Sequence, residues 1–221
     1  VSDWVDEVVD WEEVPGRHMV YYEDDLRNSG ERVLCRIENF VPYHEGLDDL
    51  IRGEKSMQAV EELLGEPSVL FKEKINFKLP GGDGFKWHQD VQAGWDTYGS
   101  IHLTLMISID ASTKENGCLQ IAHGYEGKEL LGESWAPLDE NSLGDYEIRD
   151  CITEPGDAIF FDSYVPHGSL PNQTDSPRRI LYLTYGMASE GDHRVQYYAD
   201  KRKNFPPDVE REAGKEYVFK V

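Results

Sequence analysis

Two residues that can bind a metal ion lie two positions apart in the segment Trp87-His88-Gln89-Asp90. In an extended strand, residues i and i+2 project from the same face, so the imidazole of His88 and the carboxylate of Asp90 can approach one point. A third candidate, His167, follows an apolar strand much later in the chain. Because strands distant in sequence face each other in a jelly roll, we expect His167 to complete a metal site.

The chemistry of this site is that of iron rather than zinc. Two histidines and one carboxylate on one face of an octahedral ion leave open positions, which is typical of non-haem iron(II) oxygenases. A zinc hydrolase more often has a His-Glu-x-x-His helix or several cysteine ligands, and the sequence contains neither. A His-x-Asp motif alone is weak, because a single strand histidine is more often structural. The metal-site hypothesis therefore depends on the residues around His167.

Arg178 stands at the start of the strand that follows His167, across the turn 172–177. A strand, a turn and a returning strand bring this guanidinium beside the metal ligand, where it can hold the distal carboxylate of a dicarboxylic acid by paired hydrogen bonds. Arg179 is predicted to point to the opposite face. The alternative interpretation of Arg178 is a surface cation that pairs with Asp175.

The elements that position these residues change character along the chain. Residues 1–30 indicate an arm packed on a larger body, and residues 55–64 predict a helix because their apolar side chains recur on one stripe. From residue 71 onward, apolar and polar residues alternate, which is typical of strands. This pattern predicts a mainly β fold, an antiparallel sandwich or jelly roll preceded by a small helical N-terminal region. The predicted strands are 33–37, 71–79, 101–109, 117–122, 146–153, 158–162 and 180–185.

Several short motifs follow one another between residues 71 and 185. They are His88-Gln89-Asp90, Asn116-Gly117-Cys118-Leu119, Pro155-Gly156-Asp157-Ala158-Ile159-Phe160-Phe161, His167-Gly168-Ser169 and Arg178. Their joint order resembles that of the phytanoyl-CoA dioxygenase family. The resemblance implies a double-stranded β-helix (cupin-like jelly-roll) core that uses iron(II), 2-oxoglutarate and O2. By position, it implies that His88, Asp90 and His167 bind iron and that Arg178, helped by Ser169, binds 2-oxoglutarate. We expect one such dioxygenase domain over residues 1–221.

Lys72, Lys74 and Asn76 share one face of a predicted strand. Because the family uses a basic residue before the glycine-rich loop, these side chains are candidates for binding 2-oxoglutarate or an anionic substrate. Solvated strand lysines are the commoner case in proteins, so both interpretations stay open.

Gln89, Gln92 and Trp95 lie within or just after the metal motif and are candidates for binding substrate. Trp95 is equally well interpreted as a core residue. The basic run Lys201-Arg202-Lys203 is interpreted as a solvated face without a function.

Composition excludes some classes of partner. The formal charge is −21, with 43 acidic and 22 basic residues, which repels the phosphate backbone and argues against a nucleic-acid partner. Three scattered cysteines indicate a reducing compartment, and no apolar run approaches the roughly 18 residues of a membrane span. We therefore expect a soluble cytoplasmic protein that acts on a small molecule without a membrane partner; the sequence does not indicate its oligomeric state.

The substrate class is the least determined property. The lack of a basic patch for coenzyme A favours hydroxylation of a small polar metabolite, and the segment 72–82 is similar to bacterial members that hydroxylate amine or phosphonate compounds. Asp90 stands where related halogenases carry a small residue, which favours hydroxylation. The loop His123-Gly124-Tyr125-Glu126 departs from the family's Pro-Gly-Ser/Thr-His pattern. Two alternatives remain: a cupin-like isomerase or hydrolase with a non-redox metal, and a non-catalytic binding module.

Overall fold

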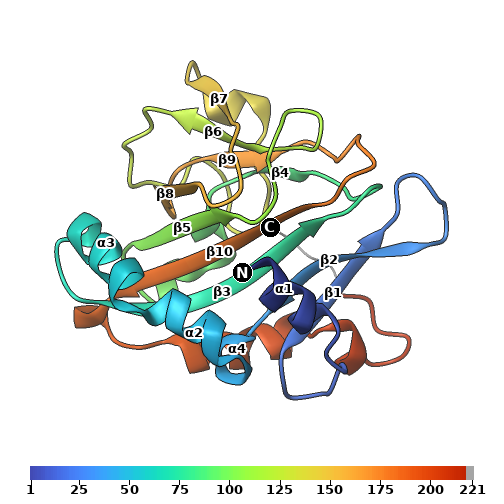
Figure 1. Ribbon diagram of the computed structural model, residues 1–221. Helices are drawn as coiled ribbons and strands as arrows, with labels where there is room; N and C mark the ends of the chain where they lie inside the picture. The colour runs from blue at the N-terminus through green and yellow to red at the C-terminus, as the bar shows by residue number, and fades with distance from the viewer. Residues whose placement is uncertain (218–221) are drawn as a thin grey trace.

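The computed structural model describes residues 1–217, whose strands form two antiparallel sheets facing each other (Figure 1). This arrangement confirms the predicted mainly β fold. In the large sheet the strand order is β1 (Met19–Asp24), β2 (Arg32–Glu38), β3 (Ser68–Lys78), β10 (Arg178–Met187), β5 (His102–Ser108) and β8 (Ala158–Asp162). In the small sheet it is β4 (Phe85–His88), β9 (His167–Ser169), β6 (Leu119–His123) and β7 (Glu147–Cys151).

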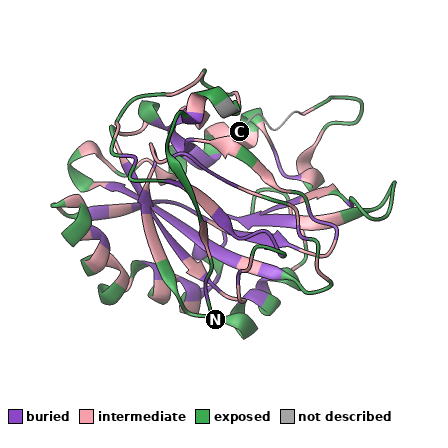
Figure 2. Ribbon diagram, turned by 90° about the horizontal axis from the view of Figure 1, so that it is seen from above, coloured by how far each residue is buried: buried purple, intermediate pink, exposed green. Residues whose placement is uncertain are grey.

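Helices cover the outer face of the large sheet, where its apolar side chains are buried (Figure 2). The predicted helix at 55–64 is confirmed as α3 (Glu54–Leu64), which ends at Gly65 with φ +79°, a backbone conformation that favours glycine. The other helices on this face are α1 (Ser2–Val9) and α2 (Glu45–Arg52), whereas α4 (Arg194–Asn204) lines the cavity on the inner side. The core on this face includes Val5, Leu47, Ile51 and Val60 from the helices and Ile75, Phe77, Leu181 and Leu183 from the strands.

The inner face of the large sheet is strongly polar. Side chains alternate along β3, so Lys72, Lys74 and Lys78 share the face that looks toward the small sheet. Lys72 is 4% exposed and Lys78 1% exposed. On β10, Arg178 pairs with Lys78 and Tyr182 with Lys74. Part of the space between the two sheets is therefore lined by basic side chains, beside an apolar cluster that includes Met106, Ile180 and Leu119.

Residues 1–30, expected to be an arm, belong instead to the body of the fold. They contribute α1 and the edge strand β1, which pairs with β2. The two buried valines of α1 belong to the main core. The arm interpretation is wrong because the apolar run at Met19–Tyr22 has no clean alternation, and its burial depends on β2 and α4. Within residues 1–217, no helix has the length and apolar character needed to cross a membrane.

Candidate active site

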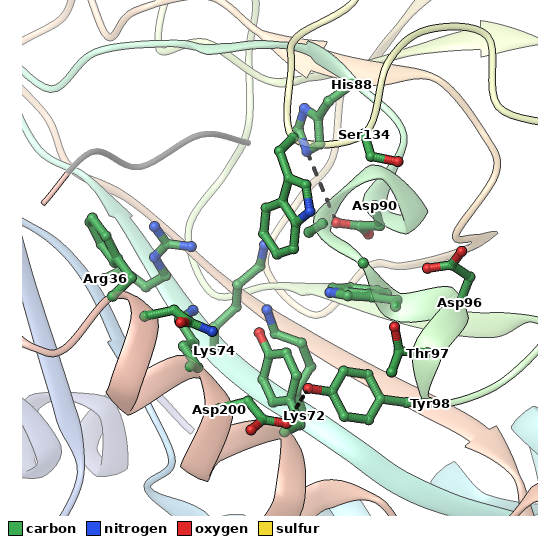
Figure 3. A pocket seen from close by; sticks show the side chains of 18 of the residues that line it. Arg36, Lys72, Lys74, His88, Asp90, Asp96, Thr97, Tyr98, Ser134 and Asp200 are labelled. Atoms are coloured by element: carbon green, nitrogen blue, oxygen red, sulfur yellow. Dashed lines mark hydrogen bonds and ion pairs between the residues drawn. The ribbon is translucent and has the colours of Figure 1, made fainter.

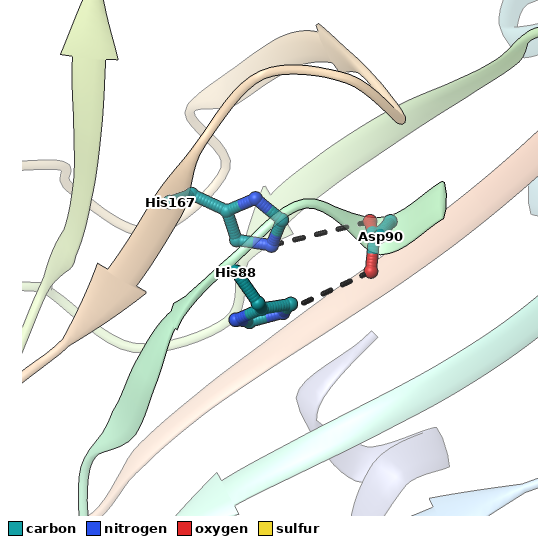
Figure 4. Close-up of side chains that lie close together, drawn as sticks. All are labelled: His88, Asp90 and His167. Carbon is teal, nitrogen blue, oxygen red and sulfur yellow. Dashed lines mark ion pairs between the residues drawn. The ribbon is translucent and has the colours of Figure 1, made fainter. Parts of the chain in front are cut away.

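His88, Asp90 and His167 converge between the two sheets (Figure 4). Their potential ligand atoms all lie within 4.8 Å of one another, the one such group among the described residues. The Nε2 atoms of both histidines are 4.0 Å from oxygens of Asp90. His88 ends β4 and His167 begins β9, and the two residues are directly paired across the small sheet. The predicted meeting of these three side chains is therefore confirmed.

A backbone carbonyl orients each imidazole. Nδ1 of His88 lies 2.7 Å from the carbonyl oxygen of Lys86, and Nδ1 of His167 lies 2.9 Å from that of Val165. Because a carbonyl only accepts hydrogen bonds, Nδ1 carries the proton in both rings. Each Nε2 then presents a lone pair toward Asp90, the outer-shell arrangement of histidines that bind metal ions.

Asp90 reaches the site by a different local structure from the one predicted. The strand ends at His88, Gln89 is extended with φ −106° and ψ 133°, and Asp90 is the first residue of the 3-10 helix η2 (Asp90–Ala93). The following amide, of Val91, donates to the carbonyl of Ser163. The single extended residue preserves the same-face relation of i and i+2, although the strand assignment for Asp90 is wrong.

The protonation states of the three side chains suit a cation. Burial and the neighbouring His167 lower the pKa of His88 to about 3, and burial also lowers the pKa of His167. Burial opposes ionisation of Asp90, but His167 and Lys74 outweigh it and lower its pKa. Two neutral imidazoles and one carboxylate are the forms that bind divalent iron, so the donor set fits the predicted metal.

Arg178 lies in the interior with unused hydrogen-bonding capacity. It is 1% exposed, and its Nε and Nη1 atoms have no partner within the described residues. Asp175, its alternative partner on the surface, pairs with Arg27 instead. An orphaned guanidinium in the core is costly unless an anion binds to it. This observation fits the distal carboxylate of 2-oxoglutarate.

Beside Arg178, a second basic side chain was not anticipated from the sequence. Nζ of Lys78 donates to Oγ of Ser169 at 2.7 Å and to the carbonyls of Leu170 and Gly117. Burial and the neighbouring Arg178 lower the pKa of Lys78 to about 6. The candidate helper Ser169 is therefore held in place by Lys78, and both lie near the predicted anion anchor.

A cavity of about 710 Å3 opens beside His88 and Asp90 (Figure 3). His88, Asp90, Lys72, Lys74 and Trp95 all line it, and Figure 3 shows both lysine side chains extending into it. Neither lysine has a hydrogen-bond or ion-pair partner in the part of the chain that the structure describes. Trp95 satisfies both of its interpretations, because it also packs against Phe71 in the core.

Further cations of the cavity come from segments that the motif analysis left out. Arg36 on β2 and Lys201 on α4 line it, and both pair with the fully buried Glu38, Lys201 at 2.6 Å. Lys201, Lys72 and Arg36 overcome the effect of burial and lower the pKa of Glu38. The interpretation of 201–203 as a solvated face is wrong for Lys201. The sequence feature that could have indicated this is the position of Lys201, which lies on the same side of the helix as Tyr197 and Tyr198.

The remaining candidates separate into two groups. Asn76 is 5% exposed on the inner face, and its Oδ1 atom has no partner, so it is available to a ligand. Gln89 and Gln92 are fully buried and do not line the cavity; their amides are hydrogen-bonded to backbone groups. The structure thus does not bring these two glutamines to the place where a substrate would lie.

The metal site predicts a contrast between two histidines on paired strands. His167→Ala removes one of three ligands, so we expect Fe(II) affinity to fall more than about 100-fold, beyond the effect of losing an outer-shell partner. His123→Ala changes an exposed histidine on the adjacent β6 and should leave affinity unchanged. Anaerobic competition with a chromogenic chelator measures both. Full iron binding by folded His167→Ala would refute the assignment.

Characterised relatives agree with this geometry. A family model described as phytanoyl-CoA dioxygenase (PhyH) matches residues 15–180. The chain is 47% identical over 218 residues to a protein named 2-aminoethylphosphonate dioxygenase, from Uncultured bacterium HF130_AEPn_1, a match covering 98% of this chain and 83% of the relative. It is 42% identical over 213 residues to a protein named methylphosphonate hydroxylase, from Gimesia maris, covering 93% and 77%.

Solved structures share the fold. EctD from S. alaskensis with 2-oxoglutarate and 5-hydroxyectoine is 25% identical, with a TM-score of 0.64 over 71% of this chain and 57% of that enzyme. The chain thus spans little more than half of that enzyme's length. EctD from the same organism with bound Fe is 21% identical and has a TM-score of 0.68, covering 86% and 67%. Both confirm the jelly roll. The chain belongs to the phytanoyl-CoA dioxygenase family of iron(II)- and 2-oxoglutarate-dependent dioxygenases.

Proposed function

We propose that the chain hydroxylates a C–H bond of a small phosphonate. The observation that carries this proposal is a pair of lysines, the buried Lys72 and the half-buried Lys74, which line the cavity without forming an ion pair among the described residues. With Arg36 and Lys201 they make four basic side chains in the cavity wall. Glu38 pairs with Arg36 and Lys201, and Asp90, Asp96 and Asp200 also line the cavity, but no carboxylate forms an ion pair with Lys72 or Lys74 among the described residues. A phosphonate brings up to two negative charges and three acceptor oxygens, and so suits two lysines that have no carboxylate partner.

The chain's own residues have separate tasks in this reaction. We assign Arg178, Ser169 and Lys78 to the distal carboxylate of 2-oxoglutarate, and His88, Asp90 and His167 to iron. Bound iron and 2-oxoglutarate supply the oxidising chemistry: substrate, O2 and 2-oxoglutarate yield the alcohol, succinate and CO2. The cations of the cavity orient the substrate by its phosphonate, leaving its carbon chain toward the histidines.

The size and chemistry of the site bear on the competing substrates. A cavity of about 710 Å3 accommodates a small polar molecule. Membership of the dioxygenase family sets aside the non-redox cupin-like enzyme and the binding module. The two relatives named for phosphonates cover nearly the whole chain, which supports the same substrate class here.

The proposal also covers the extent of the domain and the cellular compartment. We treat residues 1–221 as one dioxygenase domain, of which 218–221 lie outside the described residues. We also assign it to the cytoplasm; the free thiols of Cys35, Cys118 and Cys151 support a reducing compartment.

A substrate screen tests the function directly. Succinate release by the iron-loaded enzyme should be stimulated by small phosphonates, such as 2-aminoethylphosphonate and methylphosphonate, with one hydroxylated product per succinate. Lys72→Met should lower kcat/KM for the phosphonate by roughly 30-fold or more, because a buried charge loses its counter-ion. Stimulation by long acyl thioesters, with none by phosphonates, would contradict the proposal.

The pH dependence of substrate binding tests the role of Lys74. Burial and the neighbouring Lys72 lower the pKa of Lys74 to about 8, so the free lysine loses its charge as pH rises through that value. KM for the phosphonate should therefore be lowest below pH 8 and rise by up to about tenfold per pH unit above it. The other charged groups that act on this lysine are Asp90, Arg36 and Glu38.

Two variants make this pH measurement specific. Lys74→Met should have a high KM that does not change between pH 7 and pH 9, whereas Lys114→Met, at an exposed lysine paired with Asp150, should retain the wild-type profile. An unaltered rise of KM in Lys74→Met would show that another group controls binding.

A further inference from the structure

Two buried glutamines on either side of Asp90 hold a loop at the mouth of the cavity. We propose that Gln92, together with Gln89, is a positioning residue that fixes residues 129–138, the mouth segment, to the metal-binding motif and thereby sets how the substrate fits. The proposal rests on the phosphonate hydroxylase function for its kinetic consequences. The anchoring of the mouth segment by the two glutamines is argued from their hydrogen bonds alone.

Every hydrogen-bonding atom of the Gln92 side chain is used. Its Nε2 donates to the carbonyl oxygens of Glu133 and Ala136, each at 2.8 Å. Its Oε1 accepts from the backbone amide of Gln89 at 2.8 Å. The carbonyl of Gln92 in turn accepts from the amide of Trp135 at 2.8 Å. The residue is 0% exposed, so water cannot replace these bonds.

Gln89 reaches the same segment from the other side of Asp90. Its Oε1 accepts from the amide of Leu131 at 2.8 Å, and its Nε2 donates to the carbonyls of Glu129 and Tyr164 at 3.0 and 2.6 Å. It too is 0% exposed. The residue that supplies the iron carboxylate is therefore flanked by two amides that bind the mouth segment.

Besides the glutamine bonds, the mouth segment is held near its ends, where the amide of Leu138 donates to the carbonyl of Trp87 at 2.7 Å and the hydroxyl of Tyr125 donates to the carbonyl of Glu129 at 3.1 Å. It contains no helix or strand, and Trp135 has φ +64°, an unfavourable value for a residue with a side chain. Ser134 and Trp135 nevertheless line the cavity (Figure 3). The Trp135 ring lies so close to Gly94 that a Cβ there would be 2.8 Å from its Cζ2. The anchoring bonds thus place a specific side chain over the entrance.

The bonds that Gln89 and Gln92 make to the mouth segment all go to its backbone atoms. The side chains at the entrance can therefore differ between relatives while the segment keeps its position relative to Asp90. This separates two tasks: the glutamines fix where the entrance lies, and residues such as Ser134 and Trp135 determine what it contacts.

The test compares Gln92→Met, which keeps the length of the side chain and removes its hydrogen bonds, with Gln120→Met. Gln120 is a half-buried glutamine on β6 whose amide bonds to Asp150, away from the cavity. In Gln92→Met we expect faster hydrogen exchange at the amides of Leu131, Trp135 and Leu138. We also expect KM for the phosphonate to rise roughly 10- to 100-fold and more succinate per hydroxylated product. The Kd for 2-oxoglutarate should stay at the wild-type value.

A merely structural role would give a different result. Equal effects of the two Met variants, or a loss of 2-oxoglutarate binding that parallels the rise in KM, would overturn the proposal. Gln92→Glu serves if Gln92→Met does not fold, because it keeps the acceptor for Gln89 and removes both amide donors. If the wild type oxidises no phosphonate, the proposed function fails, while the exchange data on the two glutamines still decide whether the segment is anchored by Gln92.

Discussion

The burial of positive charge on the inner face of the large sheet is the constraint on which the rest of the structure depends. Lys72, Lys74, Lys78 and Arg178 project from β3 and β10 into the space between the sheets. Removing such charges from water is costly unless anions accompany them. The described residues supply few anions on this face. Glu38 forms ion pairs with Lys201 and Arg36, and Asp90 lies in the candidate metal site. Lys72, Lys74 and Arg178 have no carboxylate partner among the described residues, which fits the anionic co-substrate and the anionic substrate that we propose for this site.

The same constraint organises the surrounding elements. Because basic side chains occupy much of the inner face, the larger apolar core forms on the opposite face of the sheet, under α1, α2 and α3, and only a smaller apolar cluster lies between the sheets. On the inner side, α4 forms a wall of the cavity and is anchored by two buried ion pairs, Lys201 with Glu38 and Arg194 with Glu73. The lysines of β3 therefore lie on the same inner face of the sheet as the sites that we assign to metal, co-substrate and substrate.

Much of this was accessible from the sequence, for identifiable reasons. Alternation with period two marks β3 and β5 clearly, and the ordered motifs from His88 to Arg178 locate the site. The same alternation cannot say which face is inward, because an antiparallel strand ordinarily exposes its polar face. The sequence alone therefore does not distinguish the exposed from the buried interpretation of Lys72 and Lys74. The structure does, because helices cover the apolar face of the sheet and the lysines face its inner side. The contributions of Arg36 and the glutamines depend on contacts between segments far apart in sequence, which no local pattern encodes.

The most direct test of this account is anaerobic titration of the iron(II)-loaded protein with 2-oxoglutarate, followed by the visible absorption band of the bound co-substrate. Arg178→Ala is compared with Arg179→Ala, whose guanidinium lies on the other face of β10 and pairs with Asp110. The account predicts that the band appears in the wild type and in Arg179→Ala with the same Kd, and that Arg178→Ala weakens binding by roughly 30-fold or more. Unchanged 2-oxoglutarate affinity in folded, iron-loaded Arg178→Ala would contradict it.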